Sequence, residues 1–151
     1  MSPGQPLRYH WLRLRASSHP TEDLAKVEAG VRFAAGVPDL PLTSSAIETH
    51  HGGTVHLVEA TLDKARAVRD FLGRVLALPG ARDDLAATVE ARVDDEGVFY
   101  LRFDKQEAVQ GRLVLTRGED AVQARLKMEH YPATREAALD SLRLMLAADK
   151  P

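Results

Sequence analysis

An alternating segment, residues 97–104, constrains the fold of this chain more than any other stretch. Hydrophobic residues at positions 99, 101 and 103 alternate with Tyr100, Arg102 and Asp104. Successive side chains of a β-strand point to opposite faces, so the segment predicts a strand with one apolar face and one polar, partly basic face. A second apolar run, residues 111–115, follows closely and predicts a neighbouring strand.

The rest of the chain predicts an α+β fold. Further strands are expected over residues 8–16, 43–50, 54–62, 112–116 and 121–130, the last two forming a hairpin, and helices over 21–35, 63–76, 83–89 and 132–146. Residues 105–110 fit one helical turn or a loop. Asp63 and the pair Asp83-Asp84 are placed to cap helices. This order predicts a two-layer sandwich, in which helices cover one face of a mainly antiparallel sheet of about six strands.

The domain organisation follows from length and local composition. Residues 7–148 are expected to form a single α+β domain, since 151 residues suit one core. Residues 1–6 form a polar, proline-rich N-terminal lead that is expected to be flexible, and residues 149–151 form a C-terminal tail. No apolar run approaches the roughly 20 residues of a membrane span.

Composition limits the chemistry that the chain can perform. It has no cysteine, which excludes disulfides, thiolate nucleophiles and cysteine-based zinc sites and fits a cytoplasmic protein. The formal net charge is −2. A nucleic-acid site would therefore require basic residues to be segregated onto one face.

Such segregation is visible at the polar positions of the predicted strands. Most acidic residues, including Glu22, fall on predicted helices, whereas the strands and their ends carry arginine, lysine and aromatic residues. The candidate RNA-binding residues are Trp11, Arg13, Arg15, Tyr100, Arg102, Lys105, Arg112, Arg125 and Lys127. Rings can stack on bases, at about 1–3 kcal/mol per base, while arginines meet phosphates. A solvated face that keeps the sheet soluble explains the same pattern without a ligand, so the residues alone leave both interpretations open.

Catalytic and metal sites are less favoured. The adjacent His50 and His51 would point to opposite sides of a strand and could not jointly bind one ion, although His56 could approach His50 across a hairpin. Acidic pairs such as Asp83-Asp84 and Asp94-Asp95 have a simpler explanation as helix starts and turns. The sequence therefore predicts no enzyme, no cofactor and no metal site.

Seven segments, taken in order, resemble a known family. They are residues 10–16, 20–23, 50–52, 92–97, 101–106, 111–113 and 131–133, and the most specific is Leu101-Arg102-Phe103-Asp104-Lys105-Gln106 with Gly111-Arg112-Leu113. Together they are similar to small archaeal proteins described as RNA-binding and as predicted exosome subunits. The resemblance implies a fold like that of the ribosomal protein that binds the small ribosomal RNA. It also implies a non-catalytic role near RNA processing or ribosome assembly.

Three hypotheses follow for the function. The first is a non-catalytic RNA-binding protein that uses a basic and aromatic sheet face, with RNA and exosome or ribosomal components as partners. The alternative is a homodimeric structural or protein-interaction module without direct RNA binding, because arginine and aromatic residues are also enriched at protein interfaces. A metal-dependent hydrolase acting through the acids and histidines is the third.

Overall fold

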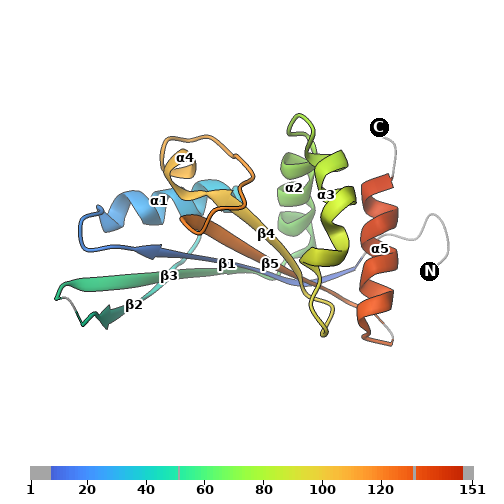
Figure 1. Cartoon of the computed structure of the whole chain (residues 1–151), viewed down its shortest axis with the longest axis horizontal. Helices are drawn as coiled ribbons and strands as arrows, with labels where there is room; N and C mark the ends of the chain where they lie inside the picture. The colour runs from blue at the N-terminus through green and yellow to red at the C-terminus, as the bar shows by residue number, and fades with distance from the viewer. Residues whose placement is uncertain (1–7, 51, 131, 148–151) are drawn as a thin grey trace. The chain divides into compact units, whose positions relative to one another are not determined.

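A five-stranded sheet with helices packed on it forms the framework of the protein. The computed structural model describes residues 8–50, 52–130 and 132–147. Within them the strands are β1 (Tyr9–Ser18), β2 (Thr43–Glu48), β3 (Thr54–Leu62), β4 (Phe99–Asp104) and β5 (Ala121–Met128). Their order in the sheet is β2-β3-β1-β5-β4, as Figure 1 shows. The predicted α+β class with an antiparallel sheet is confirmed, while the expected lead, the tail, His51 and Tyr131 lie outside the described residues.

The expected sixth strand, residues 112–116, is wrong. These residues form only an isolated bridge between Phe103 and Leu115, with the Thr116 amide donating to the Arg102 carbonyl at 2.9 Å. They therefore lie along β4 and do not form the predicted hairpin with β5. Val114 is exposed, so the run lacks the buried face that fixes a strand in a sheet.

Contacts within the chain group it into two compact units. The α1–α4 unit comprises residues 13–62 and 101–124, and the α2–α5 unit comprises residues 8–12, 63–100 and 125–147 of the described chain. The strands β1, β4 and β5 contribute residues to both units.

In the α1–α4 unit, α1 (Leu24–Ala35) packs against β3 and α4 (Lys105–Val109). Both helices lie on the same side of the strands of this unit (Figure 1). The helix α1 begins at Leu24, later than predicted, because Asp23 is its N-cap and the Asp23 carboxylate accepts a hydrogen bond from the Ala25 amide at 2.9 Å. It ends at Gly36, whose φ of 78° is favourable for glycine.

In the α2–α5 unit, α3 (Ala81–Thr88) contacts α2 (Ala65–Leu76), α5 (Arg135–Ala147) and the short 3₁₀ helix η1 (Val89–Arg92). The Arg82 guanidinium donates to the carbonyls of Met145 and Leu146 at 2.8 and 3.0 Å and so satisfies the free carbonyls in the last turn of α5.

Two predictions of helix-capping residues are wrong. The cap of α2 is Lys64 rather than Asp63, without a side-chain hydrogen bond, and α3 follows Gly80, which places Asp83 and Asp84 in its first turn.

The predicted alternation of the strands is confirmed by burial. Leu12, Leu14 and Ala16 of β1 are buried, and so are the odd-numbered residues of β4 and the even-numbered residues of β5. The positions between them hold the polar and aromatic side chains. No helix in the described part of the chain is long and apolar enough to cross a membrane.

Candidate nucleic-acid interface

The candidate basic and aromatic residues come mainly from three strands, β1, β5 and β4, that are neighbours in the sheet. They divide between the two units. The α1–α4 unit holds Arg13, Arg15, Arg102, Lys105 and Arg112, and the α2–α5 unit holds Trp11, Tyr100, Arg125 and Lys127.

Two arginines of the α1–α4 unit meet at one pocket. Arg15 from β1 and Arg102 from β4 line a pocket of about 280 Å³ together with Gln123 of β5 and Glu119. Arg102 also donates to the Gly118 carbonyl at 3.4 Å, whereas Arg13 and Arg15 occupy exposed positions of β1. The pocket holds two guanidinium groups against one carboxylate, which favours an anion.

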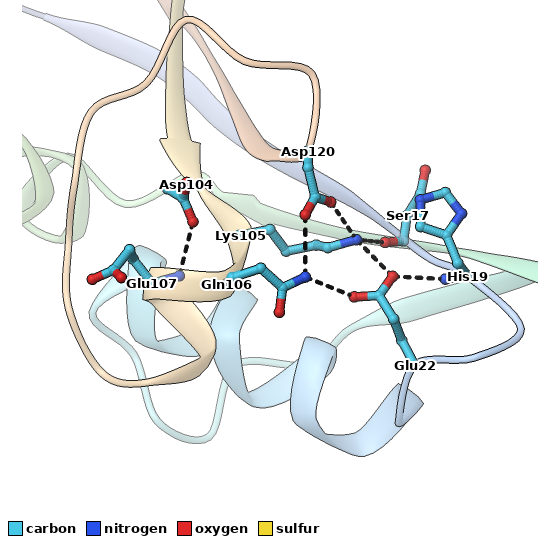
Figure 2. Close-up of polar contacts among 8 residues, drawn as sticks. All are labelled: Ser17, His19, Glu22, Asp104, Lys105, Gln106, Glu107 and Asp120. Carbon is cyan, nitrogen blue, oxygen red and sulfur yellow. Dashed lines mark hydrogen bonds and ion pairs between the residues drawn. The ribbon is translucent and has the colours of Figure 1, made fainter.

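Lys105 does not occupy the accessible position that the sequence predicts. Its side chain is only 2% exposed. Its ammonium donates to the Ser17 carbonyl, to Glu22 Oε1 and to Asp120 Oδ1, each at 2.8 Å. Figure 2 shows the Lys105 Nζ between the two carboxylates. A buried ammonium is tolerated only when it is paired and hydrogen-bonded, so Lys105 links β1, the start of α1 and the segment before β5.

Gln106 completes this group, which we call the Lys105 cluster: Ser17, Glu22, Lys105, Gln106 and Asp120. The Gln106 side-chain amide donates to Glu22 Oε2 at 3.2 Å and to Asp120 Oδ2 at 3.1 Å, so it joins the same two carboxylates a second time (Figure 2). The backbone amide of His19 donates to Glu22 Oε1 at 3.0 Å. Glu22 thus precedes α1 and serves the cluster, although the sequence placed it in the helix.

The cluster sets the protonation of its acids. Burial would raise the pKa of Glu22, but hydrogen bonds from Lys105, His19 and Gln106 outweigh it and hold that pKa below its ordinary value. The pKa of Asp120 is also lowered, chiefly by the hydrogen bond from Lys105. Both groups are therefore carboxylates at neutral pH.

A larger pocket lies against the Lys105 cluster. It has a volume of about 620 Å³ and is lined by Ser17, His19, Thr21, Glu22, Lys105, Gln106, Glu119, Asp120 and Ala121. Sequence reasoning missed it because its lining comes from the β1–α1 connection, from α4 and from the segment before β5, which are distant in the chain. The one sequence signal was the polar pair Lys105-Gln106 directly after the alternating strand that ends at Asp104.

Arg112 is not on a strand, as the sequence predicted, but in the segment that follows α4. It forms an exposed ion pair with Glu107. The hydrogen bond between these two groups raises the pKa of Arg112 and lowers the pKa of Glu107. This pairing leaves Arg112 accessible, but on a different segment from Arg15 and Arg102.

In the α2–α5 unit, Tyr100 and Lys127 are tied to the turn that precedes β4. The Tyr100 hydroxyl donates to Asp94 Oδ2 at 2.9 Å, and the Lys127 ammonium donates to the Glu96 carbonyl at 2.5 Å. Asp94 Oδ1 accepts from the amides of Glu96 and Val98, so this acid has the turn role that the sequence predicted.

These contacts shift two pKa values in opposite directions. Burial and the Asp94 carboxylate raise the pKa of Tyr100, while Arg125 opposes the shift. Burial would raise the pKa of Asp94, but its hydrogen bonds keep that pKa below its ordinary value.

Trp11 is half-buried on β1. Among the described residues no group of three or more histidine or acidic side chains is placed to hold a metal ion.

Comparison with known proteins identifies the family. A family model described as RNA binding matches residues 11–128. The chain belongs to this RNA-binding family. A relative from Pyrococcus abyssi, "RNA-binding protein PAB1135", is 32% identical over 149 residues, which cover 95% of this chain and 97% of the relative. All nine candidate residues lie within the matched range.

Solved structures from two further organisms are similar to this member of the RNA-binding family. Mth689 of Methanothermobacter thermautotrophicus, a DUF54 protein, is 30% identical with a TM-score of 0.77, over 93% of this chain and 99% of that one. AF2318 of Archaeglobus fulgidus, also assigned to DUF54, is 28% identical with a TM-score of 0.80, over 93% of this chain and 100% of that one. The fold is therefore shared along nearly the whole length.

Proposed function

We propose that this chain is a non-catalytic RNA-binding protein whose strand arginines contact the sugar-phosphate backbone. The observation that carries the proposal is the placement of Arg13, Arg15 and Arg102 at polar positions of β1 and β4, with Arg15 and Arg102 lining one pocket. Membership of the RNA-binding family supports it. Guanidinium groups bind phosphates through paired hydrogen bonds, which suits this placement.

Aromatic residues of the α2–α5 unit are proposed to contact RNA as well. Trp11 of β1 and Tyr100 of β4 occupy polar positions of their strands. Single-stranded RNA is commonly bound by rings that stack on bases beside arginines that hold the backbone. Arg125 and Lys127 of β5 add positive charge in the α2–α5 unit.

A charge-reversal experiment tests the proposal. Binding of a fluorescein-labelled single-stranded RNA of mixed sequence would be measured by fluorescence anisotropy between about 50 and 200 mM salt. The combined variant Arg13→Glu, Arg15→Glu and Arg102→Glu should bind at least about tenfold more weakly and with a smaller salt slope, because each lost phosphate contact reduces counterion release.

The matched control reverses three exposed cations on or beside helices, Lys26→Glu, Lys64→Glu and Arg66→Glu, and so produces the same change in net charge. It should retain most of the affinity. Equal losses in the two variants would mean that overall charge, and not the strand arginines, determines binding.

The cellular role proposed with this binding is RNA processing in an exosome, or ribosome assembly. It is supported by the family resemblance of the Leu101–Gln106 segment and by RNA-binding family membership. Crosslinking in cells followed by identification of bound RNA and proteins tests this role. Recovery of exosome or ribosomal components together with RNA is the expected outcome.

A protein-interaction module is the second candidate, favoured by the edge strand β2. All six residues of β2 are exposed, including Ile47 at 52%, and β2 lies at the end of the strand order. An uncovered edge strand offers unpaired backbone groups to another chain. Sedimentation of the protein without RNA distinguishes the two, because a homodimeric module would show a salt-insensitive dimer.

A further inference from the structure

We propose that the pocket beside the Lys105 cluster recognises one nucleobase that carries an exocyclic amino group, while the adjoining Arg15–Arg102 pocket holds a phosphate of the same nucleotide. The inference rests on the RNA-binding function proposed above and adds base selection to it. All residues of both pockets belong to the α1–α4 unit.

The two pockets adjoin and differ in charge. They share Ser17, Glu119 and Ala121 as lining residues. The Arg15–Arg102 pocket contains two arginines and a single carboxylate. The pocket beside the Lys105 cluster contains three carboxylates and a single ammonium. A ligand that fills both therefore needs an anionic end and a hydrogen-donating end. A nucleotide with an amino-bearing base has both.

The donors of the Lys105 cluster are already used. The three hydrogens of the Lys105 ammonium go to Ser17, Glu22 and Asp120, and the two amide hydrogens of Gln106 go to Glu22 and Asp120. What the cluster still offers a ligand is acceptor capacity, chiefly on Asp120, whose side chain is 52% exposed. Each carboxylate can accept about four hydrogen bonds, more than the cluster supplies to Asp120.

This acceptor surface is fixed before a ligand arrives. Two bonds from Lys105 and Gln106 hold the Asp120 carboxylate in one orientation (Figure 2). Carboxylates held in this way accept from the amino groups of bases, such as N4 of cytosine, and a well-placed side-chain pair discriminates strongly against the wrong base. Uracil presents carbonyl oxygens in place of an amino group, and these would face the carboxylates unfavourably.

The size of the pocket suits one nucleotide. Its volume of about 620 Å³ lies within the range of roughly 300–1,000 Å³ typical of small-molecule sites. His19 and Thr21, from the β1–α1 connection, also line it and lie outside the Lys105 cluster. His19 is exposed and supplies a ring of the kind on which unstacked bases are commonly held.

A titration with mononucleotides tests the inference directly. CMP, AMP, GMP and UMP would each be added to isotope-labelled protein while the amide signals of His19, Thr21, Gln106 and Asp120 are followed by NMR. At least one of the three nucleotides with an amino-bearing base, CMP, AMP and GMP, should shift these signals. Its affinity should be at least about fivefold higher than that of UMP. Equal affinities for all four, or shifts confined to other parts of the chain, would overturn the proposal.

Two variants separate the two ends of the nucleotide. Asp120→Asn should reduce the preference over UMP to about twofold or less, whereas Arg15→Gln should weaken all four nucleotides equally and leave the preference intact. Thr21→Val serves as a milder change in the same pocket, and the amide spectrum of each variant reports whether it is folded. A preference that survives Asp120→Asn in folded protein contradicts the assignment.

Putrescine distinguishes a nucleobase from a simple amine. If putrescine shifted the same signals as strongly as CMP, the site would be an amine site and base recognition would be wrong. The RNA-binding proposal fails separately, through the anisotropy experiment on the strand arginines. Salt-dependent RNA binding without base preference would therefore remove only the further inference.

Discussion

The ammonium of Lys105 illustrates how a single charged side chain can hold three segments together. It reaches two carboxylates and one carbonyl at 2.8 Å and is almost fully shielded from water. An isolated buried charge costs several kcal/mol, and this cost is offset only when every donor is satisfied, as it is here. The carboxylate of Glu22 depends on the lysine in turn, because the Glu22 side chain is itself mostly buried.

Removal of this ammonium should destabilise the fold. Lys105→Met should lower the free energy of unfolding by about 2 kcal/mol, since it removes the ammonium that pairs with Glu22 and donates to the Ser17 carbonyl. Urea denaturation measures the change. The control Lys26→Met removes a lysine from an exposed position of α1 and should leave the transition midpoint nearly unchanged. Equal effects at the two positions would contradict a structural role for Lys105.

The acids of the cluster make stability dependent on pH. The pKa values of Glu22 and Asp120 are lower in the folded protein than their ordinary values of 4.5 and 3.8, so the folded state binds fewer protons than the unfolded state. Their stabilising contribution is present above those ordinary values and is lost as pH falls below them. Urea denaturation of wild type should show this loss on acidification below about pH 4.5, and Glu22→Gln should show a smaller one.

Among the elements, the turn before β4 is organised by one acid and one glycine. Asp94 accepts hydrogen bonds from two backbone amides and the Tyr100 hydroxyl, and Gly97 adopts a φ of 83°. A Cβ at Gly97 would lie 3.2 Å from the Cβ of Ala138 in α5 and 3.3 Å from the Thr134 carbonyl oxygen. The turn therefore requires glycine for both its backbone conformation and its packing.

Three glycine-to-alanine substitutions should separate these causes. Gly97→Ala should cost about 2 kcal/mol because strain and crowding combine, whereas Gly80→Ala, with a similar φ of 74° but open space, should cost about 1 kcal/mol. Gly73→Ala lies within α2 with no neighbour near its Cβ and should stabilise by about 0.7 kcal/mol. Thermal denaturation gives the order, and a stabilising Gly97→Ala would contradict the packing described.

Across the whole molecule, a net charge of −2 coexists with basic strand positions. The charge is segregated because each strand alternates between the core and the polar positions, and the polar positions of β1, β4 and β5 carry all the arginines and lysines of these strands. Acidic residues on the helices balance them. Such a protein can attract RNA locally without being a polycation.

The single tryptophan reports on this surface. Trp11 is the only tryptophan of the chain, so selectively excited tryptophan fluorescence observes β1 alone. If the proposed interface is used, saturating RNA should reduce the quenching of Trp11 by acrylamide, and the protection should disappear at high salt. Protection that depends on protein concentration in the absence of RNA would instead indicate self-association through this region.

Several features could be predicted from the sequence because they depend on local patterns. The alternation in β1, β4 and β5 identified their buried and polar sides, since a strand repeats every two residues. The turn role of Asp94 and the end of α1 at Gly36 followed from local backbone chemistry. The expected strand 112–116 failed because an apolar run becomes a strand only where a partner and a buried face are available.

The sequence by itself determined the fold class, the faces of the strands and the types of residue on them. Tertiary structure decided which of those residues meet: Arg15 and Arg102 at one pocket, and Lys105 with Glu22 and Asp120 at another. Lys105 is separated from Glu22 by 83 positions along the chain, and Asp120 lies beyond a loop without regular structure. No local pattern encodes such distances, because the pairing of an ammonium with distant carboxylates depends on strand order and on the burial that only the assembled fold creates.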